Sequence, residues 1–115
     1  MNDLGQSPTP AADFGVVTSI EDGVATVSVR GEVDVYTAPR LREQLYAVVA
    51  DSIPRVVLDL SAMTFIDSTG LGVVVGTLKR LREAGGDLVI RSPSRSTRKV
   101  LEITGLTRIL EIVDG

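Results

Sequence analysis

Hydrophobic and polar positions at the start of the chain follow the period of β-strands. Residues 16–20 and 24–29 are rich in apolar side chains, and Val27 and Val29 alternate with polar neighbours, as in a half-buried strand. Turn-forming residues at 21–23 separate the two runs. The pattern therefore predicts an antiparallel hairpin.

Two longer stretches have helical spacing. The first follows Thr37, a predicted N-cap, with Pro39 in its first turn, and Pro54 stops it. The second is predicted from about Ser68 to Arg82, with the glycines 85–86 as its stop signal. The predicted inward positions are Leu41, Leu45, Val48 and Val49 in the first helix and Leu71, Val74, Val75, Leu78 and Leu81 in the second.

The remaining runs complete an α/β pattern. Residues 55–60 and 87–91 are typical of interior strands, the first covered on both faces, and residues 108–113 predict a last strand. Ser94 or Ser96 can cap a short helix between the last two strands. The order predicts a single α/β domain in which about three helices pack against a mixed sheet of about five strands. Strands that are joined through helices are expected to be parallel.

Composition narrows the chemistry of this 115-residue chain, which contains no histidine, cysteine or tryptophan. It therefore lacks the residues for a serine–histidine triad, a thiol nucleophile, a disulfide or an ordinary zinc or haem site, and we expect no metal or cofactor. The net charge of −3, with dispersed basic residues, argues against nucleic-acid binding.

The ends of the chain and its location are also predicted. Residues 1–12 are rich in Gly, Ser, Pro and Thr, so we expect a disordered tail followed by one folded domain at 13–115. No apolar run approaches the roughly 20 residues that span a bilayer, and the first residues do not form a signal peptide. The expectation is a cytoplasmic protein that does not bind membranes.

Residues 65–72 stand apart from the rest of the sequence. They lead from a predicted strand into a helix whose opening holds Asp67, Ser68 and Thr69. The Ser68 hydroxyl would lie near unpaired backbone N–H groups, where the helix dipole favours an anion. A phosphoryl group there would add about −1.5 to −2 charges. The ordinary alternative is an N-cap, since Ser, Thr and Asp occupy such turns in any α/β domain.

N-capping does not explain the glycines of the second helix. Gly70, Gly72 and Gly76 lie in its first half, where each costs about 1 kcal/mol relative to alanine. Their presence predicts that something approaches this backbone closely. Either a neighbouring strand or a partner protein would meet that requirement.

Residues 65–72 resemble the signature of the STAS domain in bacterial anti-sigma factor antagonists. Residues 31–34, in the predicted connection 31–36, resemble the other motif of that family, and the resemblance covers residues 14–113. It implies that Ser68 is phosphorylated by an anti-sigma factor that is a serine kinase. The unphosphorylated form would bind that kinase and free a sigma factor, and a serine phosphatase would reset it. The implied partner surface comprises Glu32, Asp34, Tyr36, Thr37, Asp67, Ser68, Thr69, Gly70, Leu71 and Gly72.

Two departures from the family pattern matter. Thr69 stands where many members have a second serine, so it is a second candidate acceptor. The sequence stops at Gly115, where relatives usually continue into another helix, so we expect either an uncovered apolar sheet surface or a dispensable helix. The expected state is a monomer or a weak homodimer.

Other functions remain open at the level of sequence. The domain could be a STAS scaffold or ligand sensor that is never phosphorylated, or a small hydrolase that uses Ser68. A lysine base for Ser68 would have to be Lys99, because Lys79 lies about 16 Å along the same helix. Asp34 and Asp67 could form an acid/base pair, although solvated carboxylates are the simpler interpretation. The basic cluster of Arg91, Arg95, Arg98 and Lys99 is interpreted as a solvated helix face.

Overall fold

The computed structural model describes residues 13–115, so the tail predicted at residues 1–12 lies outside the described residues. In chain order the elements are β1 (Gly15–Glu21), β2 (Val24–Val33), α1 (Ala38–Ala50), β3 (Arg55–Ile66), α2 (Ser68–Glu83), β4 (Asp87–Arg91), α3 (Arg95–Ile103), the 3₁₀ helix η2 (Leu106–Arg108) and β5 (Glu111–Val113).

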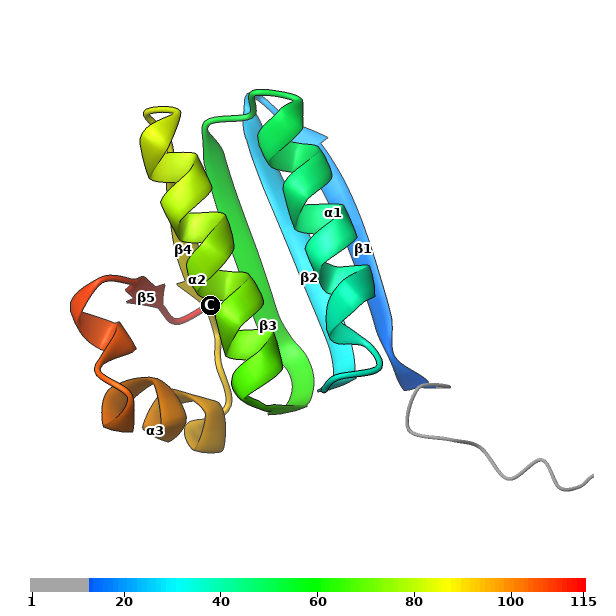
Figure 1. Ribbon diagram of the computed structural model, residues 1–115, viewed down its shortest axis with the longest axis vertical. Coiled ribbons are helices and arrows are strands. Elements are labelled where there is room, and N and C mark those ends of the chain that lie inside the picture. Colours follow the sequence, from blue (N-terminus) through cyan, green and yellow to red (C-terminus); the bar gives the residue numbers. More distant parts are fainter. Residues whose placement is uncertain (1–12) are drawn as a thin grey trace, which may run out of the picture.

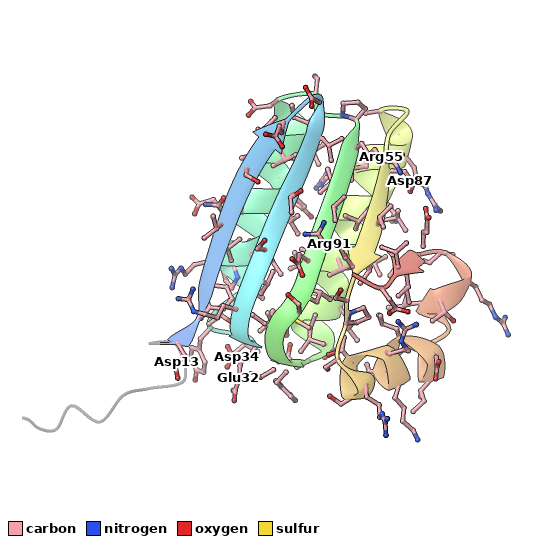
Figure 2. All side chains as sticks on the ribbon, turned by 180° about the vertical axis from the view of Figure 1, so that it is seen from behind. Asp13, Glu32, Asp34, Arg55, Asp87 and Arg91 are labelled. Carbon is pink, nitrogen blue, oxygen red and sulfur yellow. The ribbon has the colours of Figure 1, made fainter. Side chains whose placement is uncertain are left out.

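The strands form one mixed sheet in the order β1-β2-β3-β4-β5. β1 is antiparallel to β2, whereas β2, β3, β4 and β5 are mutually parallel. Both the predicted hairpin and the predicted parallel pairing across helices are thereby confirmed. Figure 1 shows α1 and α2 side by side over one face of the sheet, and Figure 2 shows the opposite face without a covering helix.

The core lies between this sheet and the two helices. The predicted apolar face of α1 is confirmed, since Leu41, Leu45 and Val48 are buried and Val49 packs against the core. In α2 the buried Val74, Leu78 and Leu81 confirm the prediction, and half-buried Leu71 packs against the core. The prediction is wrong at Val75, which is half-buried and does not belong to the core cluster. Buried α2 residues not in the predicted set are Gly70, Val73 and Thr77, and the Thr77 hydroxyl donates to the Val73 carbonyl over 2.8 Å. That hydrogen bond allows a polar residue on a buried face.

Three predicted strands differ from the structure. Burial alternates along residues 55–60, with Val57 and Asp59 half-buried, because helices cover only one face of the sheet. The prediction that this strand is covered on both faces is therefore wrong. β2 extends through Val33, so much of the predicted connection 31–36 is strand. The last strand is shorter than predicted, because η2 occupies the start of residues 108–113.

Two register shifts in the second half of β3 determine which side chains are exposed near the candidate site. The pairing of β2 with β3 shifts register between Ser28 and Arg30 and again between Gly31 and Glu32. Each shift adds a residue on β3, so strict alternation is lost. As a result Met63 and Ile66 are both buried, while the two residues between them are exposed.

Candidate functional site

The candidate site is formed where two neighbouring parallel strands end. Val33 of β2 and Ile66 of β3 are the last paired residues, and Asp34 and Asp67 follow them directly. The Asp67 backbone N–H donates to the Val33 carbonyl over 3.1 Å. The β2–α1 connection and the start of α2 therefore lie together, and Figure 2 shows Glu32 and Asp34 at this end of the sheet.

Asp67 is the residue that caps α2. Its Oδ1 atom accepts from the Gly70 N–H over 3.0 Å, and its carbonyl accepts from the Leu71 N–H over 2.9 Å. The sequence offered Asp67, Ser68 and Thr69 as possible caps, and the carboxylate takes the role. Because Asp67 caps the helix, the Ser68 hydroxyl is not needed for capping.

Ser68 is the first helical residue and is exposed, as is Thr69. Within residues 13–115 neither hydroxyl makes a hydrogen bond, and the N–H groups of these two residues have no acceptor. The first N–H groups of a helix point out of it, and its dipole favours a negative charge there. A phosphate on Ser68 would thus meet two available donors.

The β2–α1 connection is held rigid by its own side chains. Asp34 Oδ1 accepts from the N–H groups of Tyr36 and Thr37 over 2.9 and 3.1 Å. The Thr37 hydroxyl donates to the Glu32 carbonyl over 2.8 Å and accepts from the Asp34 N–H over 2.9 Å. Thr37 is the first-turn N-cap by position, as predicted, but its side chain makes no capping bond with α1. It is buried and braces the connection, while Tyr36 projects with 82% of its surface exposed.

The three helix glycines have different surroundings. A Cβ on Gly70 would lie 2.6 Å from Val33 Cγ1 and 2.7 Å from Ile66 Cγ1, and one on Gly76 would lie 2.9 Å from the Tyr46 hydroxyl. Gly70 is therefore required by packing inside the domain, whereas at Gly76 only the flexible end of the Tyr46 side chain would have to shift. A Cβ on Gly72 would meet nothing within 4 Å among the described residues. Gly72 and half-buried Leu71 continue the exposed surface that begins at Ser68.

Sequence reasoning missed two apolar side chains at this edge. Val35 is 55% exposed and Phe65 is 49% exposed, in addition to Tyr36, which was predicted. Val35 could have been found, because it is an apolar residue in an otherwise polar turn. Phe65 could not, because its exposure depends on the register shift in β3. Beside Phe65 lies a hollow of about 180 Å³ that is lined by Thr64, Phe65, Ile66, Ser96, Thr97 and Val100.

Most of the other candidate side chains are engaged in hydrogen bonds or ion pairs within the folded chain. Asp34 and Asp67 each commit one carboxylate oxygen to backbone N–H groups, so they act as structural acceptors here. The predicted basic cluster is divided between elements: Arg91 pairs with Asp59 over 2.9 Å and Arg98 pairs with Asp114 over 2.6 Å. Exposed Arg95 and Lys99 complete it on α3.

The surroundings of Asp59 lower the pKa of its carboxyl group. Burial, the largest single influence, raises the pKa of Asp59, but hydrogen bonds from Ser61 and Arg91 and the charge of Arg91 together outweigh it and lower the pKa below 3.8. This pair lies on the open face of the sheet and does not touch Ser68.

Two further observations concern residues 13–115. They contain no cluster of three or more acidic side chains arranged to hold a metal ion. No helix within this range has the length and apolar character that crossing a membrane requires.

Comparison with known proteins gives a consistent result. Residues 16–114 match the family model described as the STAS domain. An anti-sigma-B factor antagonist of Staphylococcus aureus is 36% identical over 103 residues, which is 90% of this chain and 95% of that protein. The crystal structure of an anti-sigma factor antagonist from Mycobacterium paratuberculosis has a TM-score of 0.80 and 37% identity, covering 87% of this chain and 85% of that one. The phosphorylated form of SpoIIAA, a Bacillus cell fate determinant, has a TM-score of 0.71 at 21% identity over 89% and 90% of the two chains, a likeness of fold.

Proposed function

The chain belongs to the STAS domain family, and from that premise we propose that it is an anti-sigma factor antagonist. In its unphosphorylated form it binds an anti-sigma factor and thereby releases a sigma factor. The names of the Staphylococcus and Mycobacterium relatives support this function. The proposed partner surface comprises the exposed start of α2 and the connection that carries Tyr36.

The switch in this proposal is phosphorylation of Ser68. The observation that carries it is that Asp67 caps α2, which leaves the exposed Ser68 hydroxyl without a structural task. A phosphate there would meet the free N–H groups of the first turn and strain the domain little. At a protein interface the same dianion would bring desolvation cost and like-charge repulsion. Phosphorylation would thus abolish binding while the fold persists.

The chemistry in this proposal is supplied by the partners. The anti-sigma factor is a serine kinase that transfers the γ-phosphoryl group of ATP to the Ser68 oxygen, releasing ADP, and a serine phosphatase hydrolyses the ester. The chain has no histidine that could act as a base. In this proposal the chain is a substrate and a binding module, and it has no catalytic activity of its own. It acts in the cytoplasm.

Intact-mass measurement after incubation with ATP and the cognate kinase tests the proposal. The wild-type chain should gain one phosphate, Ser68→Ala should gain none, and Thr69→Ala should still gain one. Binding of the kinase without any gain of phosphate would instead favour an unmodified STAS scaffold. Phosphate retained on Ser68→Ala and lost on Thr69→Ala would move the switch to Thr69. Labelling of Ser68 by a serine-reactive activity probe would point to a hydrolase.

A further inference from the structure

Within residues 13–115, β1 leaves one long edge of the sheet open. It is the outermost strand in both views, and its seven residues pair with β2 without a register shift. Residues 15–21 contain no lysine or proline, and Val17 and Ile20 are 64% and 51% exposed. Natural proteins usually protect such an edge with charges, prolines or bulges, because its unpaired N–H and C=O groups can pair with another strand.

We propose that a second copy of this chain pairs with β1 in antiparallel fashion about a two-fold axis at Thr18. In that register Gly15 faces Glu21 of the second copy and Val16 faces its Ile20. All seven residues of β1 are then paired. Like strands related by a two-fold axis form such an isologous contact with themselves.

Charge complementarity supports this register. Gly15 pairs with Arg30 of β2, and the Arg30 side chain lies over Gly15: a Cβ there would be 2.6 Å from Nη2. Arg30 Nε donates to the Asp13 carbonyl over 3.0 Å, which fixes the guanidinium and leaves its terminal nitrogens for another acceptor. Within residues 13–115 Arg30 has no ion-pair partner. Glu21 of the second copy would arrive beside it, and the symmetry makes the contact twice.

The two faces of β1 agree with the pairing. Val16 packs against the core and Thr18 bonds to Gln44 of α1, so alternation places Ile20 on the helix side and Glu21 on the open face. Glu21 therefore shares the face of Arg30. A two-fold axis at Val17 would instead place Glu21 opposite Asp13 of the second copy, which is a like-charge contact. It would also remove the pairing between Ile20 and Val16 of the second copy.

The dimer would be weak and would leave the Ser68 surfaces free. A ladder of seven residues is small beside the roughly 1,600 Å² of a standard stable interface, so we expect association only at micromolar or higher concentration. The antiparallel arrangement puts the two Ser68 surfaces at opposite ends of a continuous sheet. This inference concerns a different edge from the proposed partner surface and does not depend on it.

Sedimentation equilibrium of the full chain, over a concentration series at low salt, tests the pairing. The wild type should form dimers, while Glu21→Arg and Arg30→Glu should each weaken association at least tenfold. The double variant Glu21→Arg/Arg30→Glu should restore it, because the opposite charges are exchanged. Glu111→Arg on β5 makes the same change in net charge far from β1 and should leave association as in the wild type.

Several outcomes would overturn the proposal. A wild-type chain that stays monomeric up to millimolar concentration excludes the dimer. Equal effects of Glu21→Arg and Glu111→Arg, or failure of the double variant to regain association, exclude this register. If Arg30→Glu unfolds the chain, as far-UV circular dichroism would show, Ile20→Glu replaces it. Ile20 is exposed, so that change should abolish the dimer without unfolding the chain, and persistence of the dimer would exclude the β1 contact.

Discussion

The Asp67 backbone N–H donates to the Val33 carbonyl over 3.1 Å and so fixes the start of α2 to the end of β2. The bond brings together two segments that are more than thirty positions apart in the sequence. The start of α2, which carries Ser68, therefore lies beside the connection that follows Val33. That connection is internally hydrogen-bonded, so the surface exists before any partner arrives.

The proposed charge switch predicts a specific response at Ser68. We expect Ser68→Asp to weaken binding of the anti-sigma factor about a hundredfold, equivalent to about 3 kcal/mol. Ser68→Asn is the matched control, since it has nearly the same shape without the charge, and it should retain most of the affinity. Isothermal titration calorimetry measures both. Equal weakening by the two variants would mean that size, and not charge, disturbs the interface.

Asp34 has a structural role that can be separated from its charge. Its Oδ1 accepts from the backbone N–H groups of Tyr36 and Thr37, and an asparagine oxygen can accept the same bonds. Asp34→Asn should therefore change the free energy of unfolding little, whereas Asp34→Ala should lower it by about 1–2 kcal/mol. Urea unfolding measures the difference. If Asp34→Asn is as unstable as Asp34→Ala, the carboxylate charge and not the acceptor holds the connection.

Gly70 and Gly72 should respond oppositely to alanine. Gly70→Ala would press a methyl group against Val33 and Ile66, so we expect a loss of about 1–3 kcal/mol of stability. Gly72→Ala has open space and should gain up to about 1 kcal/mol from helix propensity. If a partner packs on this backbone, the same variant should bind the anti-sigma factor more weakly. A loss of stability in Gly72→Ala similar to that in Gly70→Ala would contradict the packing difference.

Most of the fold could be predicted from the hydrophobic periodicity of the sequence and from its turn and capping residues. The hairpin and both long helices follow from local patterns, and the structure confirms them. The sequence left the cap of α3 open between Ser94 and Ser96, and the structure assigns it to Ser94. The coverage of β3 could not be predicted, because the apolar run 55–60 suits a half-buried strand as well as a fully buried one. The cause lies in the position of the helices on one face of the sheet, which no local pattern specifies.

The site was predictable in its chemistry and less so in its geometry. A cluster of Asp67, Ser68 and Thr69 at a helix start signals capping or anion binding, but only the structure assigns the cap to Asp67. The three helix glycines looked alike in sequence. The partners that distinguish them, such as Tyr46 beside Gly76, come from distant elements.

Gly76 and Tyr46 should be energetically coupled. A methyl group on Gly76 would lie 2.9 Å from the Tyr46 hydroxyl, which must then move. In the wild-type background we expect Gly76→Ala to be neutral or destabilising. In a Tyr46→Phe background the hydroxyl is absent, and the substitution should stabilise by up to about 1 kcal/mol through helix propensity. Thermal unfolding of the four proteins gives the coupling, and strictly additive effects would exclude the contact.

The ion pair between Asp59 and Arg91 predicts a response to acid. Because the pKa of Asp59 is lowered in the folded state, the unfolded chain binds more protons at acidic pH. The stabilisation by this carboxylate is therefore complete above about pH 4, the ordinary pKa of an aspartate, and is lost as the pH falls through the folded-state pKa.

Asp59→Asn should consequently cost about 1 kcal/mol at pH 7, and the difference from wild type should shrink as the pH falls below about 4. Asp114→Asn is the matched control, because Asp114 pairs with Arg98 but its side chain is 86% exposed, and such pairs contribute little. Chemical unfolding at pH 7, 4 and 3 measures both variants. A constant difference between wild type and Asp59→Asn over this range would show that the pair does not titrate with unfolding. If the two variants lose equal stability at pH 7, the partial burial of Asp59 does not make its ion pair with Arg91 more stabilising than the exposed pair of Asp114 with Arg98.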